Sequence, residues 1–315
     1  MTTQPHRIDV HHHIIPEPYA KELDAAGYSM VAGVERPPWS AELSLEVMDK
    51  HGIEVAIGSI SAPGVHFGDD GKAASLARSC NEASAELSAK HPGRFGGFAT
   101  VPLPCVDGAL RELEYALDKL ELDGVVLLAS QSDGRYLGDP AFDELLAELD
   151  RRGAVAFIHP AIPASLPHIP VDIPVFAMEF TFDTTRAAFN LAYTGALERY
   201  PNIRFILSHA GGTVPYLAWR FSLLWLREPE LMERAPKGGM HYLQQLYYDT
   251  ALSANPHALR SLCELVGPDR ILFGSDYPFA PEPITGVTVE GVQSFDGFDS
   301  AARERICLLY TSDAA

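Results

Sequence analysis

Histidines and one aspartate stand at the ends of short apolar runs in this sequence. The run "RIDVHHH" carries His11 and His13, "FIHP" carries His159, "LSHAGG" carries His209 and "FGSDYP" carries Asp276. Imidazole nitrogens with one carboxylate oxygen suit zinc, and also manganese, iron or cobalt. Each residue alone has an ordinary explanation, such as a polar strand end or a turn. Their recurrence at the same place in successive runs predicts one catalytic metal site.

The spacing of the first two histidines fits a shared ligand face. Side chains of a strand alternate between two faces, so His11 and His13 point one way and His12 points the other. Alone, the pair is as compatible with a polar strand end as with a metal site. Together with the other strand ends, it predicts His11 and His13 as a ligand pair and His12 as a structural residue.

Eight short apolar runs alternate with amphipathic segments along the chain. The runs are rich in Val, Ile, Phe and Leu, which is typical of parallel strands covered on both sides. Segments such as 108–124 and 140–154 place leucines at helical spacing between the runs. This repetition predicts an α/β fold, the (β/α)8 TIM barrel, with a doubly wound open sheet as the alternative. No GxGxxG follows the first predicted strand, which disfavours that alternative. The predicted strands are 7–12, 54–61, 94–101, 124–129, 154–159, 203–209, 246–250 and 270–275.

Two long connections stand out between the predicted strands. Residues 16–42 exceed a simple connection and predict a small insertion after strand 1, near the mouth of the barrel. Residues 161–182 are rich in proline and predict a long loop. Barrel enzymes keep their active sites at the C-terminal ends of the strands, so such a loop is expected to shape the substrate pocket.

The composition limits the classes of function. The chain has 315 residues, 47% of them apolar, and a formal charge of −18 from 24 Lys and Arg against 42 Asp and Glu. This charge argues against nucleic acids and anionic membranes as partners, although one local arginine suffices for a small anionic substrate. No apolar run is long enough to span a membrane, and the first residues lack a signal-peptide pattern. Four scattered cysteines without a CxxC pair fit a reducing cytoplasm.

The last nine residues break the pattern that precedes them. The segment "CLLYTSDAA" resembles the translation of a sequencing adaptor found at the ends of metagenomic gene fragments. We therefore predict one domain over residues 1–306, followed by a non-native tail over 307–315. An ordinary helix end is the alternative.

The quoted motifs resemble the amidohydrolase superfamily. HxH on the first strand, "SHAGG" on the sixth and "GSDYP" on the eighth are similar to its non-hydrolytic branch, the aminocarboxymuconate-semialdehyde decarboxylase-like family. The segments "PPWS", "PGVHFGD" and "EFTFDTTRAA" look most like sequences of the 6-methylsalicylate decarboxylase type. The resemblance covers roughly residues 7–306. The sequence departs from the family at its final helix, which we expect to be truncated.

The resemblance implies a role for each matching residue. It implies one divalent metal, zinc first and manganese second, held by His11, His13, His159 and Asp276. It makes His209 the acid/base group beside the metal, and it implies a homodimer. An arginine eleven residues after that histidine would meet the substrate carboxylate, in some members across the dimer interface; here it is Arg220, for which a surface helix charge is the alternative.

A small aromatic carboxylate is the substrate that this resemblance implies. Loss of CO2 from an ortho-hydroxybenzoate requires a proton on the ring carbon, which Asp276 or His209 could deliver. Trp39, Phe180 and Phe182 are the aromatic candidates for substrate contact, with plain packing as the alternative for each. Metal-dependent hydrolysis of a lactone or amide, and a catalytically silent metal-binding protein, are the two competing hypotheses.

Overall fold

Eight parallel strands form the centre of the molecule. The computed structural model describes residues 6–168 and 172–312, and the strands pair in the order β1-β4-β5-β6-β7-β8-β9-β10. Val10 donates its backbone N–H to Phe273, and Asp276 donates to His11, so the segment after β10 closes on β1. This is the predicted (β/α)8 TIM barrel. The strands are β1 Arg7–His13, β4 Ile53–Ser59, β5 Phe95–Thr100, β6 Gly124–Leu128, β7 Val155–His159, β8 Arg204–Leu207, β9 Tyr247–Asp249 and β10 Ile271–Leu272.

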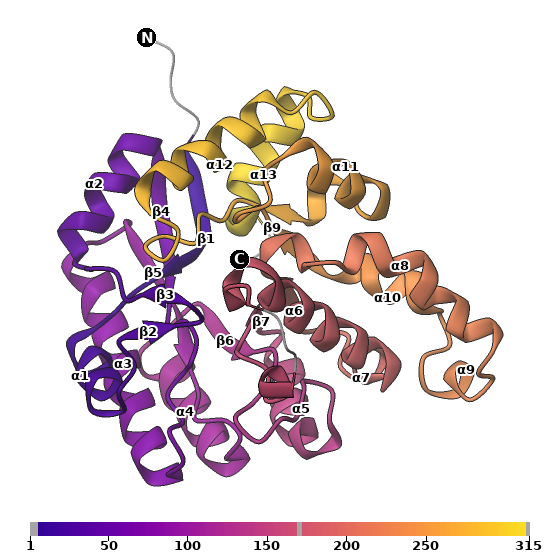
Figure 1. Ribbon diagram of the computed structural model, residues 1–315, viewed down its shortest axis with the longest axis horizontal. Helices are drawn as coiled ribbons and strands as arrows, with labels where there is room; N and C mark the ends of the chain where they lie inside the picture. The colour runs from indigo at the N-terminus through magenta and orange to yellow at the C-terminus, as the bar shows by residue number, and fades with distance from the viewer. Residues whose placement is uncertain (1–5, 169–171, 313–315) are drawn as a thin grey trace.

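Helices surround the strands on the outside (Figure 1). Local sequence sets several of their ends: Ser40 and Asp69 accept a backbone N–H at the first turns of α2 and α3, and Gly52 and Gly153 end α2 and α5 in the left-handed conformation. The helices are α1 Glu17–Ala25, α2 Ala41–His51, α3 Asp70–Lys90, α4 Val106–Asp118, α5 Asp143–Arg152, α6 Val175–Tyr193, α7 Ala196–Arg199, α8 Val214–Ser222, α9 Leu231–Arg234, α10 Gly239–Gln245, α11 Pro256–Leu265, α12 Glu282–Ser294 and α13 Ser300–Ser312. No helix of the described residues is long and apolar enough to cross a membrane.

The two long connections turn out differently. The connection after β1 is the predicted small insertion: helix α1 and a hairpin of β2 Met30–Val31 and β3 Val34–Glu35. The prediction of a loop over 161–182 is wrong for its last part, because α6 already begins at Val175. Pro174 precedes this helix, where its fixed backbone angle and missing N–H cost nothing.

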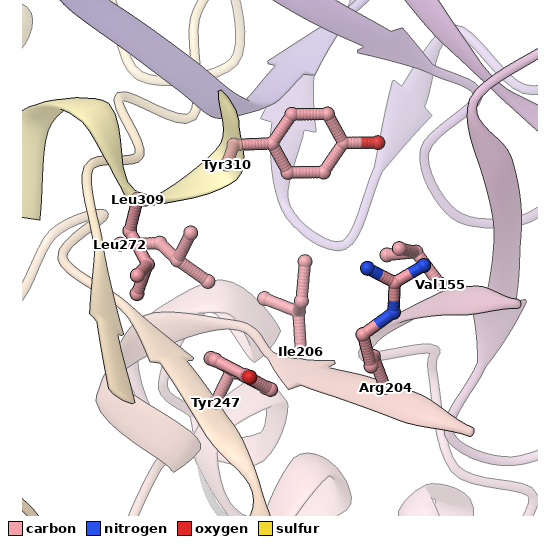
Figure 2. Close-up of a pocket in the computed structure, with 7 residues that line it drawn as sticks. All are labelled: Val155, Arg204, Ile206, Tyr247, Leu272, Leu309 and Tyr310. Carbon is pink, nitrogen blue, oxygen red and sulfur yellow. The ribbon is translucent and has the colours of Figure 1, made fainter. Parts of the chain in front are cut away.

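Helix α13 closes the N-terminal end of the barrel. Figure 2 shows Leu309 and Tyr310 lying over the starts of the strands, around a small cavity of about 30 Å³ that Arg204 and Tyr247 also line. The helix runs without interruption through residue 306, and Leu309 is buried. That residues 307–315 are non-native stays a prediction.

Candidate metal centre

Four predicted ligands meet at the C-terminal end of the barrel. His11 and His13 come from β1, His159 from the end of β7 and Asp276 from the turn after β10, and all four are buried. One donor atom from each lies within 4.8 Å of the others. Parallel strands of a barrel all end on the same face of the barrel, so residues more than 250 positions apart in the sequence become neighbours here.

The spacing of the donor atoms fits a divalent cation. The two Nε2 atoms of His11 and His13 are 3.1 Å apart, and Oδ1 of Asp276 lies 3.2 Å and 3.1 Å from them. A zinc ion that holds tetrahedral ligands at about 2.0–2.1 Å separates them by about 3.3 Å. Two imidazole nitrogens and a carboxylate oxygen this close together require positive charge between them, so the donor set fits a metal.

Hydrogen bonds on the outer nitrogens orient all three imidazoles. Nδ1 of His11 faces the carboxylate of Asp249 at 2.6 Å and Nδ1 of His159 faces the carbonyl of Pro160 at 2.8 Å, so these two nitrogens carry a proton and donate. Nδ1 of His13 faces the hydroxyl and the carbonyl of Ser59 at 3.1 and 3.3 Å, and that hydroxyl itself donates to the carbonyl of His12, which leaves it to accept from His13. The Nε2 lone pairs are left for a cation.

The electrostatics of the centre favour positive charge. Burial alone would lower the pKa of His11, but the carboxylates of Asp249 and Asp276 raise that pKa to about 10. Burial and the neighbouring His13 and His11 keep the pKa of His159 well below its usual value. Although burial opposes it, the charge on His11 and three imidazole hydrogen bonds hold the pKa of Asp276 well below the ordinary range. The negative charge of the two carboxylates is larger than the positive charge of the one protonated imidazole. The centre therefore attracts a cation.

His12 faces away from the centre, as the strand alternation predicts. Its Nδ1 lies 3.1 Å from Asp9 and its Nε2 3.0 Å from the hydroxyl of Ser44. Asp9 also accepts the backbone N–H groups of His11 and Ser275. This buried network fixes the two backbone segments that carry ligands.

His209 lies beside the four donors, in a tight turn after β8. Its Nε2 is 3.5 Å from Oδ2 of Asp276, and its buried Nδ1 has no hydrogen-bond partner among the described residues. The backbone of His209 is left-handed, with φ of 55°, and Asp249 accepts its N–H at 2.8 Å. A side chain at Gly212, where φ is 63°, would meet the carbonyl oxygen of Thr181 at 2.0 Å, so helix α6 packs directly on this turn.

A cavity of about 650 Å³ opens onto the centre. His159, His209 and Asp276 form part of its wall. The wall is largely apolar, and no lysine or arginine among residues 6–168 and 172–312 lines it. Its aromatic members are Phe176, Phe180 and Phe279, and its neutral polar members are Ser61, Thr181 and Ser253.

Comparison with known proteins assigns the family. A family model described as amidohydrolase matches residues 8–310. The chain belongs to the amidohydrolase family. It is 40% identical over 278 residues to a 6-methylsalicylic acid decarboxylase of Penicillium expansum, and the matched region covers 87% of this chain and 86% of that protein. It is 29% identical over 252 residues to a gamma-resorcylate decarboxylase of Rhizobium sp. (strain MTP-10005), with 75% and 76% covered. A solved dihydroxybenzoic acid decarboxylase from Polaromonas sp. JS666, with bound manganese and 2-nitroresorcinol, superposes with a TM-score of 0.77 at 25% identity, covering 96% of this chain and 94% of that one.

Three predicted substrate contacts of this amidohydrolase lie away from the cavity wall. Trp39 borders a separate groove and donates its indole N–H to Ser44. Phe182 lies on α6 outside the lining, whereas Phe180 lines the cavity and approaches the His159 ring edge-on at 6.1 Å. Arg220 is exposed on α8. Substrate contact by Trp39, Phe182 and Arg220 stays a prediction.

Sequence reasoning missed three residues around the centre. Asp249 ends β9, in the run "LYYDT", and the rule that found the other ligands, a polar residue at a strand end, applies to it as well. Phe279 follows Asp276 by three residues and lies edge-on to His13 at 5.5 Å. Phe176 lines the cavity from the first turn of α6, which the sequence did not reveal as a helix.

Backbone strain is concentrated at this amidohydrolase cavity. Ala32, His209, Leu252 and Asp276 all line it, and all have φ between 52° and 64°. Non-glycine residues rarely adopt this conformation, and it persists where surrounding contacts enforce it. The concentration of strain in one wall supports this cavity as the functional site.

Proposed function

We propose that this amidohydrolase is a metal-dependent, non-oxidative carboxy-lyase of a small ortho-hydroxybenzoate, of the 6-methylsalicylate type. The observation that carries the proposal is an apolar cavity whose wall holds both a cation site and His209. Relatives at 40% identity over most of the chain are 6-methylsalicylic acid decarboxylases, which supports this substrate class.

The metal would be held by His11, His13, His159 and Asp276. A divalent cation there supplies positive charge for the carboxylate and phenol oxygens of the substrate. Zinc is our first choice because three nitrogen donors and one oxygen donor suit it. Manganese is the second, supported by the related manganese-containing decarboxylase.

The protein must deliver one proton to the ring. When the bond between the ring carbon and the carboxylate breaks, its electron pair stays on the ring carbon and CO2 leaves. A proton must then form the new C–H bond. His209 and Asp276 face the cavity with Nε2 and Oδ2 3.5 Å apart, so one proton can be held between them and passed to the ring.

The cavity wall supports loss of CO2 by excluding water. Phe180 and Phe279 lie against the imidazoles of His159 and His13, next to the place where the substrate carboxylate would bind. A carboxylate desolvated by apolar rings is favoured to leave as neutral CO2.

The test is turnover of 6-methylsalicylate by the zinc-loaded and manganese-loaded protein. We expect loss of substrate to match formation of 3-methylphenol and CO2, and His209→Asn to abolish turnover while the bound metal remains. Unchanged 6-methylsalicylate, together with turnover of a lactone or amide to an acid without CO2, would instead show hydrolysis. Near-normal turnover by His209→Asn would refute the role of His209.

We further propose a homodimer in which α8 lies at the interface. Tyr216 and Trp219 on α8 are 83% and 70% exposed, and Leu226 in the turn that follows is 85% exposed. Arg220 stands among these apolar side chains, and the cavity lining offers no cation of its own, so an arginine from the second subunit could meet the substrate carboxylate. Sedimentation of Trp219→Glu, which we expect to be a monomer while the parent is a dimer, tests the interface.

A cytoplasmic location is also our proposal, supported by four cysteines without a disulfide.

A further inference from the structure

Asp249 makes contact with two separate parts of the centre. Its carboxylate is fully buried at the end of β9. Oδ2 accepts the Nδ1–H of His11 at 2.6 Å, while Oδ1 accepts the backbone N–H of His209 at 2.8 Å and of Ala251 at 3.0 Å. One carboxylate thus reaches a proposed metal ligand and the turn that carries the proposed proton-transfer group.

We propose that Asp249 is a positioning residue that orients His11 for the metal and holds His209 at a fixed place beside it. The metal part stands on the donor geometry alone. The part concerning His209 rests on the proposed decarboxylation.

The contact with His11 fixes which ring nitrogen carries the proton. A carboxylate has no hydrogen to donate, so Nδ1 must carry a proton, and Nε2 is the ring nitrogen left to bind the metal. Gly274 lies behind the pair, where an added Cβ would come within 2.8 Å of the Cβ of His11 and 3.1 Å of that of Asp249. The backbone of Gly274 therefore packs against the base of both side chains, where a larger residue would not fit.

The contact with His209 stabilises an unfavourable backbone. The φ of 55° at His209 and 54° at Ala210 place two consecutive non-glycine residues in the left-handed region. A charge-assisted hydrogen bond from the N–H of His209 to a buried carboxylate offsets part of that cost. The His11 and His209 rings lie 5.0 Å apart between centroids, so Asp249 holds them as a pair.

The first experiment measures manganese affinity by titration followed by electron paramagnetic resonance. In Asp249→Asn, Oδ1 can still accept the two backbone N–H groups, but the amide NH2 faces Nδ1 of His11 and favours a proton on Nε2. We expect about 10–100-fold weaker manganese binding, the usual effect of losing such a partner.

Asp183→Asn is the matched control for this measurement. Asp183 is equally buried and accepts the backbone N–H of Ala161 and the hydroxyl of Ser130, but it touches no ligand ring. We expect its manganese affinity to stay within threefold of the parent. If Asp249→Asn binds manganese within threefold of the parent, or no more weakly than Asp183→Asn does, the inference about His11 is overturned.

The second experiment compares kcat and KM at saturating manganese. Asp249→Asn keeps the acceptor for His209, so its kcat should fall less than that of a variant without this acceptor. Asp249→Ala removes it and should lower kcat at least tenfold with KM little changed; if that variant does not fold, Asp249→Ser replaces it. Equal kcat values for Asp249→Asn and for Asp249→Ala, or its replacement Asp249→Ser, overturn the inference about His209. If the parent turns over no hydroxybenzoate at all, the proposed function fails, and the manganese titration still decides the inference about His11.

Discussion

Replacing Gly212 by alanine tests how closely helix α6 must pack on the turn that carries His209. The added Cβ would lie 2.0 Å from the carbonyl oxygen of Thr181, whereas ordinary contact begins at 3.4 Å. Helix α6 or the turn must therefore move by about 1.4 Å. Thr181 and Phe180 on that helix line the cavity, so the movement separates the cavity wall from His209.

Two terms add up to the expected loss of stability. Alanine in the left-handed conformation costs about 1–2 kcal/mol relative to glycine. Gly212 has φ of 63° and ψ of −116°, a conformation that is less favourable still for alanine, and overpacking against a helix backbone costs about 1–3 kcal/mol more. Gly153 is the reference for a left-handed alanine without a clash, because its φ is 58° and its ψ 36°, and an added Cβ there would meet nothing within 4 Å. Gly153→Ala should therefore show only the cost of the left-handed conformation.

Urea unfolding of the parent and both variants measures the difference. We expect the free energy of unfolding of Gly212→Ala to fall below that of Gly153→Ala by at least about 1–3 kcal/mol, the cost of overpacking alone. Its KM for the hydroxybenzoate should rise, while Gly153→Ala keeps the parent value because it ends α5, away from the cavity. Equal loss of stability in the two variants would refute the reasoning that α6 and the turn are in rigid contact.

Three further outcomes follow from the structure. Removing the metal with a chelator should lower the unfolding temperature without unfolding the protein at 25 °C, since a ligand at about 1,000 times its Kd contributes about 4 kcal/mol; calorimetry with and without manganese measures this. Leu309→Ala should cost about 2–3 kcal/mol in urea unfolding because Leu309 is buried against the barrel floor. Arg151, together with Arg152, lowers the pKa of Glu148 to about 2. The stabilisation by Glu148 is therefore complete above its unfolded pKa of about 4.3 and lost as the pH falls toward 2. In urea unfolding, Glu148→Gln should be less stable than the parent by about 1 kcal/mol at pH 7, a small value because the pair is partly exposed, and by about half as much at pH 3.

The barrel and its ligands could be predicted because both follow from local patterns. A parallel strand covered on both sides needs a continuous apolar run, so each strand is visible in the sequence without knowledge of its neighbours. A polar residue at the end of such a run then reaches the shared face of the barrel. His11, His13, His159 and Asp276 all obey this rule, and so does Asp249, where it was not applied.

The aromatic lining of the cavity could not be predicted because it depends on which way a helix faces. Phe176 and Phe180 are four residues apart on α6 and share the side that lines the cavity, while Phe182 is two residues further and points elsewhere. The sequence predicts a loop over residues 161–182, and a loop prediction does not say which side chains face the cavity. Substrate contact by Trp39 stays a prediction; its indole N–H donates to Ser44, and the residue borders a separate groove.

Hydrogen bonds to two buried carboxylates hold the backbone around the centre. Asp9 accepts backbone N–H groups from His11 and Ser275, on the two segments that carry ligands, and Asp249 does the same for the turn of His209. Each of these carboxylates is buried and receives several hydrogen bonds, so removing either leaves backbone N–H groups unpaired in the interior. The left-handed residues of the cavity wall are held by these contacts and by the closed barrel beneath them. Metal removal should therefore change the charge of the centre and the activity, but leave the backbone of the ligand segments in place.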